Sequence, residues 1–110
     1  MCEFRKFIVT PTGYVAQCPF CHSIEIVYGT SVIHIGFIDW ASLNEYLASV
    51  RQNCHTAENR KTKNIMLHFG GNGPLQMFLA EEELHEFCDL VDQADSEMNA
   101  RHLIELFNNC

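Results

Sequence analysis

The chain has 110 residues, of which 47% are hydrophobic and 19% are charged, and its formal net charge is −7. This size and composition predict a single globular domain over residues 1–110 and argue against a disordered chain. The acidic balance argues against binding to nucleic acid or to an anionic membrane surface, because both need clustered Lys and Arg.

The N-terminus lacks the features of a secretory leader, since no run of seven or more apolar residues follows residues 1–5. No segment approaches the roughly 20 apolar residues of a membrane span. We therefore expect a soluble, cytoplasmic protein. In that reducing compartment its six cysteines are expected to be thiols or metal ligands and not disulfides.

Four short strands are predicted before the first helix, over residues 7–10, 14–17, 24–28 and 31–37. Apolar residues alternate in the third and fourth of these strands, as one buried sheet face requires. The turn residues Pro11, Gly13 and Gly29 separate the strands. The buried faces are expected to be formed by Ile24, Ile26 and Tyr28 and by Ile33, Ile35 and Phe37.

A helix is predicted from Asp39, as its cap, to about Arg51. Ile38 and Leu43 are spaced to form a hydrophobic staple across that cap. An apolar stripe at helical spacing predicts which side of the helix is buried. The stripe is formed by Trp40, Leu43, Leu47 and Val50.

A polar segment over residues 52–63 is expected to be a loop, and residues 65–69 and 75–79 are expected to form a hairpin. Phe37-Ile38-Asp39 before the first helix is similar to Phe78-Leu79-Ala80 before the second, which suggests a duplicated ββα unit. The predicted fold is α+β, an antiparallel sheet of five to six strands with two helices packed on one face.

A second helix is predicted from about Glu81, and its N-terminal part is strongly acidic, with eight Asp and Glu residues between Glu81 and Glu97. Its apolar face changes direction near Ser96. Either the helix breaks there, or it continues and exposes a second apolar face to a partner. In the continuous alternative, Leu103, Ile104 and Phe107 form a candidate homodimer surface.

Cys18-Pro19-Phe20-Cys21 is the motif with the most specific chemistry, because two cysteines at this spacing can chelate a metal or cycle as a dithiol. The motif resembles the active-site tetrapeptide of glutaredoxins. In that family the first cysteine opens a helix, whereas here alternating β-type residues follow the pair. This context favours metal binding, with thiol-redox function through Cys18 and Cys21 as the alternative.

A Cys-Pro-x-Cys turn between two strands also resembles the knuckle of a zinc ribbon, although the chain lacks the second Cys-x-x-Cys pair of that fold. A structural zinc needs four ligands. Cys2 is predicted as the third, because the first strand can bring it beside Cys18. His22 is predicted as the fourth, with His34, Cys54 and His55 as alternatives. In a third interpretation the thiols only fill space.

No nucleophile elbow, His-Glu-x-x-His motif or phosphate loop is present in the sequence. Cys88 lies on the apolar stripe of the second helix and is predicted to be a core residue. We therefore expect a small zinc-stabilised domain that binds another protein without catalysis, the acidic helix steering that partner and the surplus apolar face binding it.

The order of these features resembles a group of short bacterial proteins of unknown function. The resemblance rests on Met1-Cys2, Gly13-Tyr14, the Cys18/Cys21 pair and Tyr28-Gly29-Thr30, followed by two Leu-rich helices. It covers nearly the whole chain and implies no activity. It implies that Cys2 acts together with Cys18 and Cys21, because all three occur together in that group.

Overall fold

The computed structural model describes residues 3–53, 65–70 and 75–108. Four strands come first: β1 (Arg5–Thr10), β2 (Gly13–Gln17), β3 (Ile24–Tyr28) and β4 (Ser31–Ile35). They are followed by α1 (Phe37–Asn53), the hairpin strands β5 (Ile65–Phe69) and β6 (Leu75–Leu79), and α2 (Glu81–Asn108). The chain is thus α+β, as predicted.

The six described strands form two sheets and not the single sheet of five to six strands that the sequence suggested. One sheet has four antiparallel strands in the order β1-β2-β3-β4, and the other is the β5-β6 hairpin. Periodicity shows which residues are strands but not which strands pair, which is why the number of sheets was wrong. The duplicated ββα unit is not confirmed, because four strands precede α1 and two precede α2.

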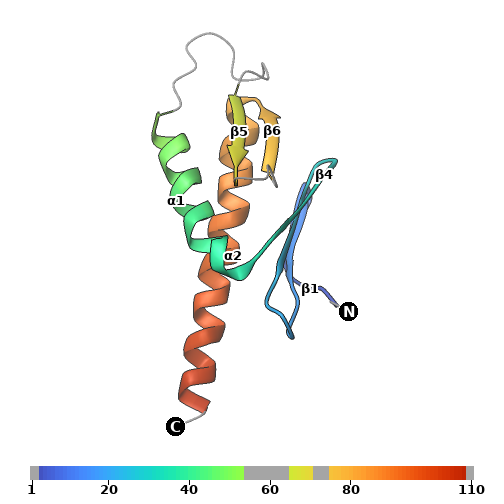
Figure 1. Ribbon diagram of the computed structural model, residues 1–110, viewed down its shortest axis with the longest axis vertical. Coiled ribbons are helices and arrows are strands. Elements are labelled where there is room, and N and C mark those ends of the chain that lie inside the picture. The colour runs from blue at the N-terminus through green and yellow to red at the C-terminus, as the bar shows by residue number, and fades with distance from the viewer. Residues whose placement is uncertain (1–2, 54–64, 71–74, 109–110) are drawn as a thin grey trace.

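The helix α2 is the element on which the others pack. It contacts α1, β1, β2 and β6 (Figure 1), so it lies between α1 and the four-stranded sheet. The predicted packing of both helices on one sheet face is therefore wrong for α1, whose main contact is α2. One continuous core joins all the layers.

The buried faces of β3 and β4 agree with the predicted alternation up to Ile35. Phe37 does not continue that face: it opens α1 and is 55% exposed. Helix α1 starts two residues before Asp39, whose backbone N–H donates to Gly36 O at 3.0 Å. Asp39 thus lies in the first helical turn, where a negative charge is favourable. Ile38 is 92% exposed, so the predicted staple with Leu43 does not form.

The predicted stripe of α1 is confirmed, with Trp40, Leu43 and Leu47 buried and Val50 packed against the core. Trp40 Nε1 donates to Asp95 Oδ1 of α2 at 3.0 Å, which fixes the two helices to each other through a satisfied indole N–H. The polar segment expected as a loop lies mostly outside the described residues.

Helix α2 is continuous through Ser96, so of the two alternatives the break there is wrong and the continuous helix is confirmed. Its start is capped by Glu83, whose Oε1 accepts from the Ala80 backbone N–H at 2.9 Å. A Glu97–Arg101 pair, 3.0 Å apart, supports the helix just after Ser96 at i,i+4 spacing. Figure 1 shows the C-terminal end of α2 extending beyond the sheets and α1.

In the part of the chain that the structure describes, no helix is long and apolar enough to cross a membrane.

Candidate functional site

The Cys18–Cys21 segment forms a tight turn between β2 and β3. The Cys18 N–H donates to Ser23 O at 3.0 Å, and the His22 N–H donates to Cys18 O at 2.9 Å. His22 adopts a left-handed backbone conformation, with φ of 64°. Such a conformation is uncommon outside glycine and reverses the chain sharply. Both cysteines therefore lie on one tight turn between two strands, as predicted.

The sulfur of Cys18 is fully buried and surrounded by backbone donors. The Cys21 N–H makes the largest contribution to lowering the pKa of the Cys18 thiol, and the N–H groups of Phe20 and Glu3 act in the same direction. Burial and the Cys21 side chain oppose them, but the pKa remains below its ordinary value. The backbone of the turn thus favours the thiolate form of Cys18 more than water does for a free cysteine.

Cys21 lies on the open side of the turn, where its Sγ is 3.4 Å from Ser23 Oγ. It is exposed, so a ligand bound by both sulfurs would be reached from this side. Cys18, Cys21 and Cys88 are all thiols in the structure and none forms a disulfide.

His22 is exposed, and its ring is directed toward Phe37, with the ring centroids 6.0 Å apart. Among the described residues no group of three or more His, Cys, Asp or Glu side chains could hold a metal ion. The predicted four-ligand set is therefore assembled only in part: Cys18 and Cys21 share the turn, and the His22 ring does not join them in this conformation.

The remaining candidates for metal ligands are Cys2, Cys54, His55 and His34. Cys2, Cys54 and His55 lie outside the described residues. His34 is exposed, as its alternation with Ile33 and Ile35 predicts, and its ring is held by neighbours on the sheet. Cys88 is a core residue, as predicted, with its Sγ 3.9 Å from Leu47 O.

A polar network on the outer face of the four-stranded sheet was missed by sequence reasoning. Glu25 on β3 accepts a hydrogen bond from the Tyr14 hydroxyl and contacts His34 Nε2 at 2.9 Å. Tyr14 and then His34 lower the pKa of Glu25, while the bond to Glu25 raises the pKa of Tyr14. Lys6 Nζ lies 4.3 Å from the centre of the Tyr14 ring. In the sequence, the polar residues Glu25 and His34 alternate with buried apolar residues along these strands, and this alternation could have indicated a polar network on the outer face.

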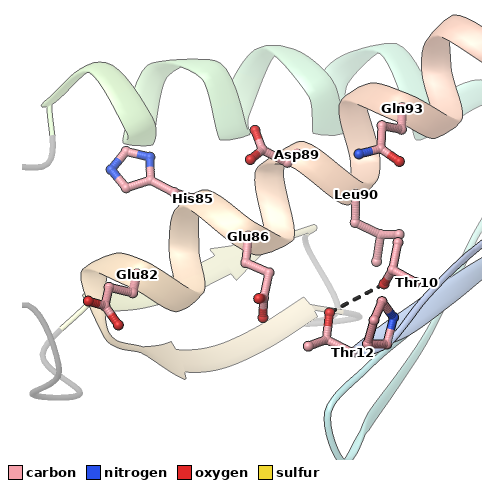
Figure 2. Close-up of a pocket in the computed structure, with 9 residues that line it drawn as sticks. Thr10, Thr12, Glu82, His85, Glu86, Asp89, Leu90 and Gln93 are labelled. Carbon is pink, nitrogen blue, oxygen red and sulfur yellow. Dashed lines mark hydrogen bonds between the residues drawn. The ribbon is translucent and has the colours of Figure 1, made fainter.

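An open pocket of about 480 Å³ lies between the β1–β2 turn and the acidic side of α2. Thr10 and Thr12 line one wall, and Figure 2 shows Glu86 pointing from α2 toward that turn. On the neighbouring side, Arg51 of α1 pairs with Asp89 at 2.7 Å. The pocket is a negatively charged hollow that would attract a basic group on a partner.

Tyr28 sits beside this hollow, and its hydroxyl donates to Glu86 Oε1 at 2.6 Å. Burial first, and then Glu86, raise the pKa of Tyr28 well above its ordinary value of 10.0. Because the unfolded chain ionises Tyr28 at the lower pH, its stabilising contribution is present below pH 10.0 and is lost as the pH rises toward the raised pKa.

We expect the free energy of unfolding to fall less steeply in Tyr28→Phe than in the original chain as the pH rises from about 8 to about 11. Urea titrations at each pH measure this difference. Tyr14→Phe serves as the comparison, because the pKa of Tyr14 is also raised but its largest cause is the bond to Glu25 and not burial. Equal slopes for Tyr28→Phe and the original chain would contradict the linkage.

The C-terminal half of α2 carries a second feature, an exposed apolar surface. Leu103, Ile104 and Leu106 are each exposed by more than half, at 55%, 58% and 53%. Leu103 and Ile104 belong to the predicted partner surface. Leu106 was not predicted, and the side chain of Phe107 lies outside the described residues. We call Leu103 and Ile104 the α2 apolar surface; Leu106, two residues after Ile104, lies on another side of the helix from Ile104.

No family model, no curated protein and no solved structure matches this chain.

Proposed function

We propose that this protein is a zinc-stabilised protein-interaction domain without catalysis, in which Cys2, Cys18, Cys21 and His22 bind zinc. The observation that carries the proposal is the sulfur of Cys18, which is buried and surrounded by backbone N–H donors. A buried thiolate needs a neighbouring positive charge as well as hydrogen bonds. A zinc ion bound from the open side by Cys21 would supply that charge.

The N-terminal segment supports Cys2 as the third ligand. One of the N–H groups directed at Cys18 Sγ belongs to Glu3, the residue directly after Cys2. Cys2 therefore directly precedes, in the sequence, a residue that contacts the proposed zinc ligand. This place in the sequence supports the proposal that Cys2 binds the same metal ion as Cys18.

His22, the proposed fourth ligand, can bind the metal only after one conformational change. His22 is exposed on the same turn, and its ring would have to rotate away from Phe37 to reach the metal. The rotation moves a side chain on the surface and leaves the core intact. Thiol ligands also need a reducing environment, so the proposal includes a cytoplasmic location.

Elemental analysis with native mass spectrometry, on protein purified without chelator, tests the zinc site. One zinc per chain supports it, and a metal-free folded protein contradicts it. The lowered pKa of Cys18 favours the alternative function, a thiol-redox protein that uses Cys18 and Cys21. A reversible Cys18–Cys21 disulfide with a cytosol-like reduction potential, in metal-free protein, would support that alternative.

The interaction part of the proposal rests on the α2 apolar surface. Apolar side chains grouped on a helix that extends beyond the rest of the domain favour a protein partner. We propose that a second copy of the chain is one such partner, through Leu103, Ile104 and Phe107. The acidic face of α2 would steer a basic partner without adding much affinity.

We expect Leu103→Glu to convert a dimer into a monomer, because it places a charge in the centre of an apolar contact. Light scattering coupled to size-exclusion chromatography measures the mass. His102→Glu is the matched control, since it adds a charge at the adjacent exposed position of the same helix. The homodimer is contradicted if the original chain and Leu103→Glu have the same mass.

A further inference from the structure

Strand β4 forms one edge of the four-stranded sheet and leads through Gly36 into α1 (Figure 1). Its partner on one side is β3, with which it pairs along its whole length without a shift in register. Among the described residues, no other strand or loop hydrogen-bonds to it through the backbone. Such an edge presents a row of backbone N–H and C=O groups to which another strand can bind.

The turn before β4 identifies which of its backbone groups face outward. Gly29, with φ of 57°, occupies the first central position of a two-residue hairpin turn, as a type II′ turn requires. Tyr28 and Ser31 flank that turn and form the first hydrogen-bonded pair, and such pairs then occur at every second position of the ladder. The N–H and C=O groups of Val32 and His34 are therefore directed away from β3, toward the free edge.

The opposite edge of the sheet carries features that prevent such pairing. β1 contains two charged residues, Arg5 and Lys6, and its register with β2 shifts between Lys6 and Ile8. Helix α2 also packs against β1. The sequence of β4 contains no proline and no Asp, Glu, Lys or Arg. Charges, bulges and proline are the usual protections of a strand edge, so of the two edges it is β4 that is open to a further strand.

The side chains around this edge favour an occupant that is both apolar and positively charged. Val32 is 61% exposed, and Phe37 and Ile38, which follow β4 in the chain, are exposed as well. The exposed carboxylate of Asp39 comes next, in the first turn of α1. No Lys or Arg occurs in residues 7–50, a range that contains β2, β3, β4 and most of α1. Charge complementarity therefore favours a segment with Lys or Arg next to its apolar residues.

We infer that an extended segment of a partner protein binds the free edge of β4 as a fifth strand, with apolar residues at alternate positions and Lys or Arg at the end beside Asp39. The inference rests on the proposed interaction function and not on bound zinc. The backbone groups of Val32 and His34 form the hydrogen bonds, and the exposed apolar side chains select the segment. A second copy of the chain is disfavoured at this edge, because its own β4 brings no Lys or Arg to meet Asp39.

The test uses a synthetic peptide, Lys-Val-Thr-Val-Thr-Val-Lys, blocked at both ends and titrated into the original chain by calorimetry. We expect the peptide to bind, and the N–H groups of Val32 and His34 to become protected from hydrogen exchange in the complex, as measured by nuclear magnetic resonance. The N–H of Ile33 is bonded to β3 in the free protein and should keep the protection it already has. A general gain in stability would not produce this alternation.

Variants at Val32 test the backbone pairing. Val32→Pro removes one outward N–H without removing a bond to β3, and proline is tolerated at such edge positions. We expect it to bind the peptide about ten-fold more weakly, because a peptide carbonyl loses its donor. Val32→Thr is the matched control, since it keeps the N–H and a β-branched side chain, and it should bind within about two-fold of the original chain. A peptide with Glu in place of both Lys should bind more weakly, and added salt should reduce the difference.

The outcomes separate this inference from the proposed function. If the peptide does not bind, or binds without protecting Val32 and His34, pairing at β4 is overturned, while zinc content and the mass of the chain still test the proposed function. If these N–H groups are already protected without peptide, in a dimer that Leu103→Glu does not dissociate, a second copy occupies the edge and the inference is overturned. Should Val32→Pro fail to fold, a peptide methylated at every backbone nitrogen replaces it, since equal binding of both peptides by the original chain would also overturn the pairing.

Discussion

Cys18→Ser is expected to release zinc and to lower the free energy of unfolding by several kcal/mol. A serine hydroxyl is a poor zinc ligand, and at this position it would be fully buried. Metal that binds only the folded state stabilises it by about 2.7 kcal/mol at free zinc about 100 times the dissociation constant. The variant should lose this contribution and the hydrogen bonds that the Cys18 sulfur accepts. Thermal unfolding with and without added zinc measures both.

Cys88→Ala is the matched control for this experiment. Cys88 is also a buried thiol, but it lies in the core beside Leu47 and far in sequence from the turn. Removing it should lower stability by about 1–2 kcal/mol through lost packing and leave the zinc content unchanged. A metal-free original chain, or a Cys18→Ser protein as stable as the original, would contradict the zinc proposal.

Phe87→Ala is expected to lower the free energy of unfolding by about 3–5 kcal/mol, whether or not zinc is bound. Phe87 is a fully buried residue of α2, and its ring meets Tyr28 of β3 edge-on at 5.5 Å. Its removal leaves a cavity where α2 packs on the four-stranded sheet. Urea unfolding, followed by circular dichroism, measures the change.

Phe78→Ala removes the same side chain from a surface position, because Phe78 on β6 is 61% exposed. Its effect should stay within about 0.5 kcal/mol. If the two alanine variants lose similar stability, the core does not lie where α2 meets the sheet.

Much of the secondary structure could be predicted, because each strand or helix carries its own periodicity. The alternation of Ile24, Ile26 and Tyr28 located β3 and its buried face, and the stripe from Trp40 to Leu47 located the buried side of α1. Periodicity failed at Phe37 and Ile38, where an apolar pair opens a helix and stays exposed. A local pattern cannot report whether a neighbour covers a side chain.

The continuity of α2 shows a second limit of prediction from sequence periodicity. The apolar face turns at Ser96, and a break would have let each half bury its own face. The structure keeps one helix, with Asp95 bonded to Trp40 just before Ser96 and Arg101 paired with Glu97 just after it. The helix therefore exposes the second face. This is why Leu103 and Ile104 could be predicted as a surface only in one of two alternatives.

One part of the candidate site could be predicted from local sequence patterns, and another part could not. The Cys18–Cys21 turn is local in sequence, so its place between two strands could be predicted. The network of Tyr14, Glu25 and His34 depends on the register of three strands, which no local pattern specifies. The direction of the His22 ring depends on Phe37, which is distant in the sequence.

The central position of α2 has a consequence for synthesis on the ribosome. α2 follows every other element in chain order, yet the four-stranded sheet and α1 both pack against it. The sheet can pair its strands as it emerges, but its apolar face stays uncovered until Phe87 and its neighbours leave the exit tunnel. During that interval the nascent chain is open to chaperones and to aggregation. Synonymous codon changes that slow translation within α2 keep the paired sheet uncovered for longer, so they should lower the soluble yield more than the same changes placed within β1.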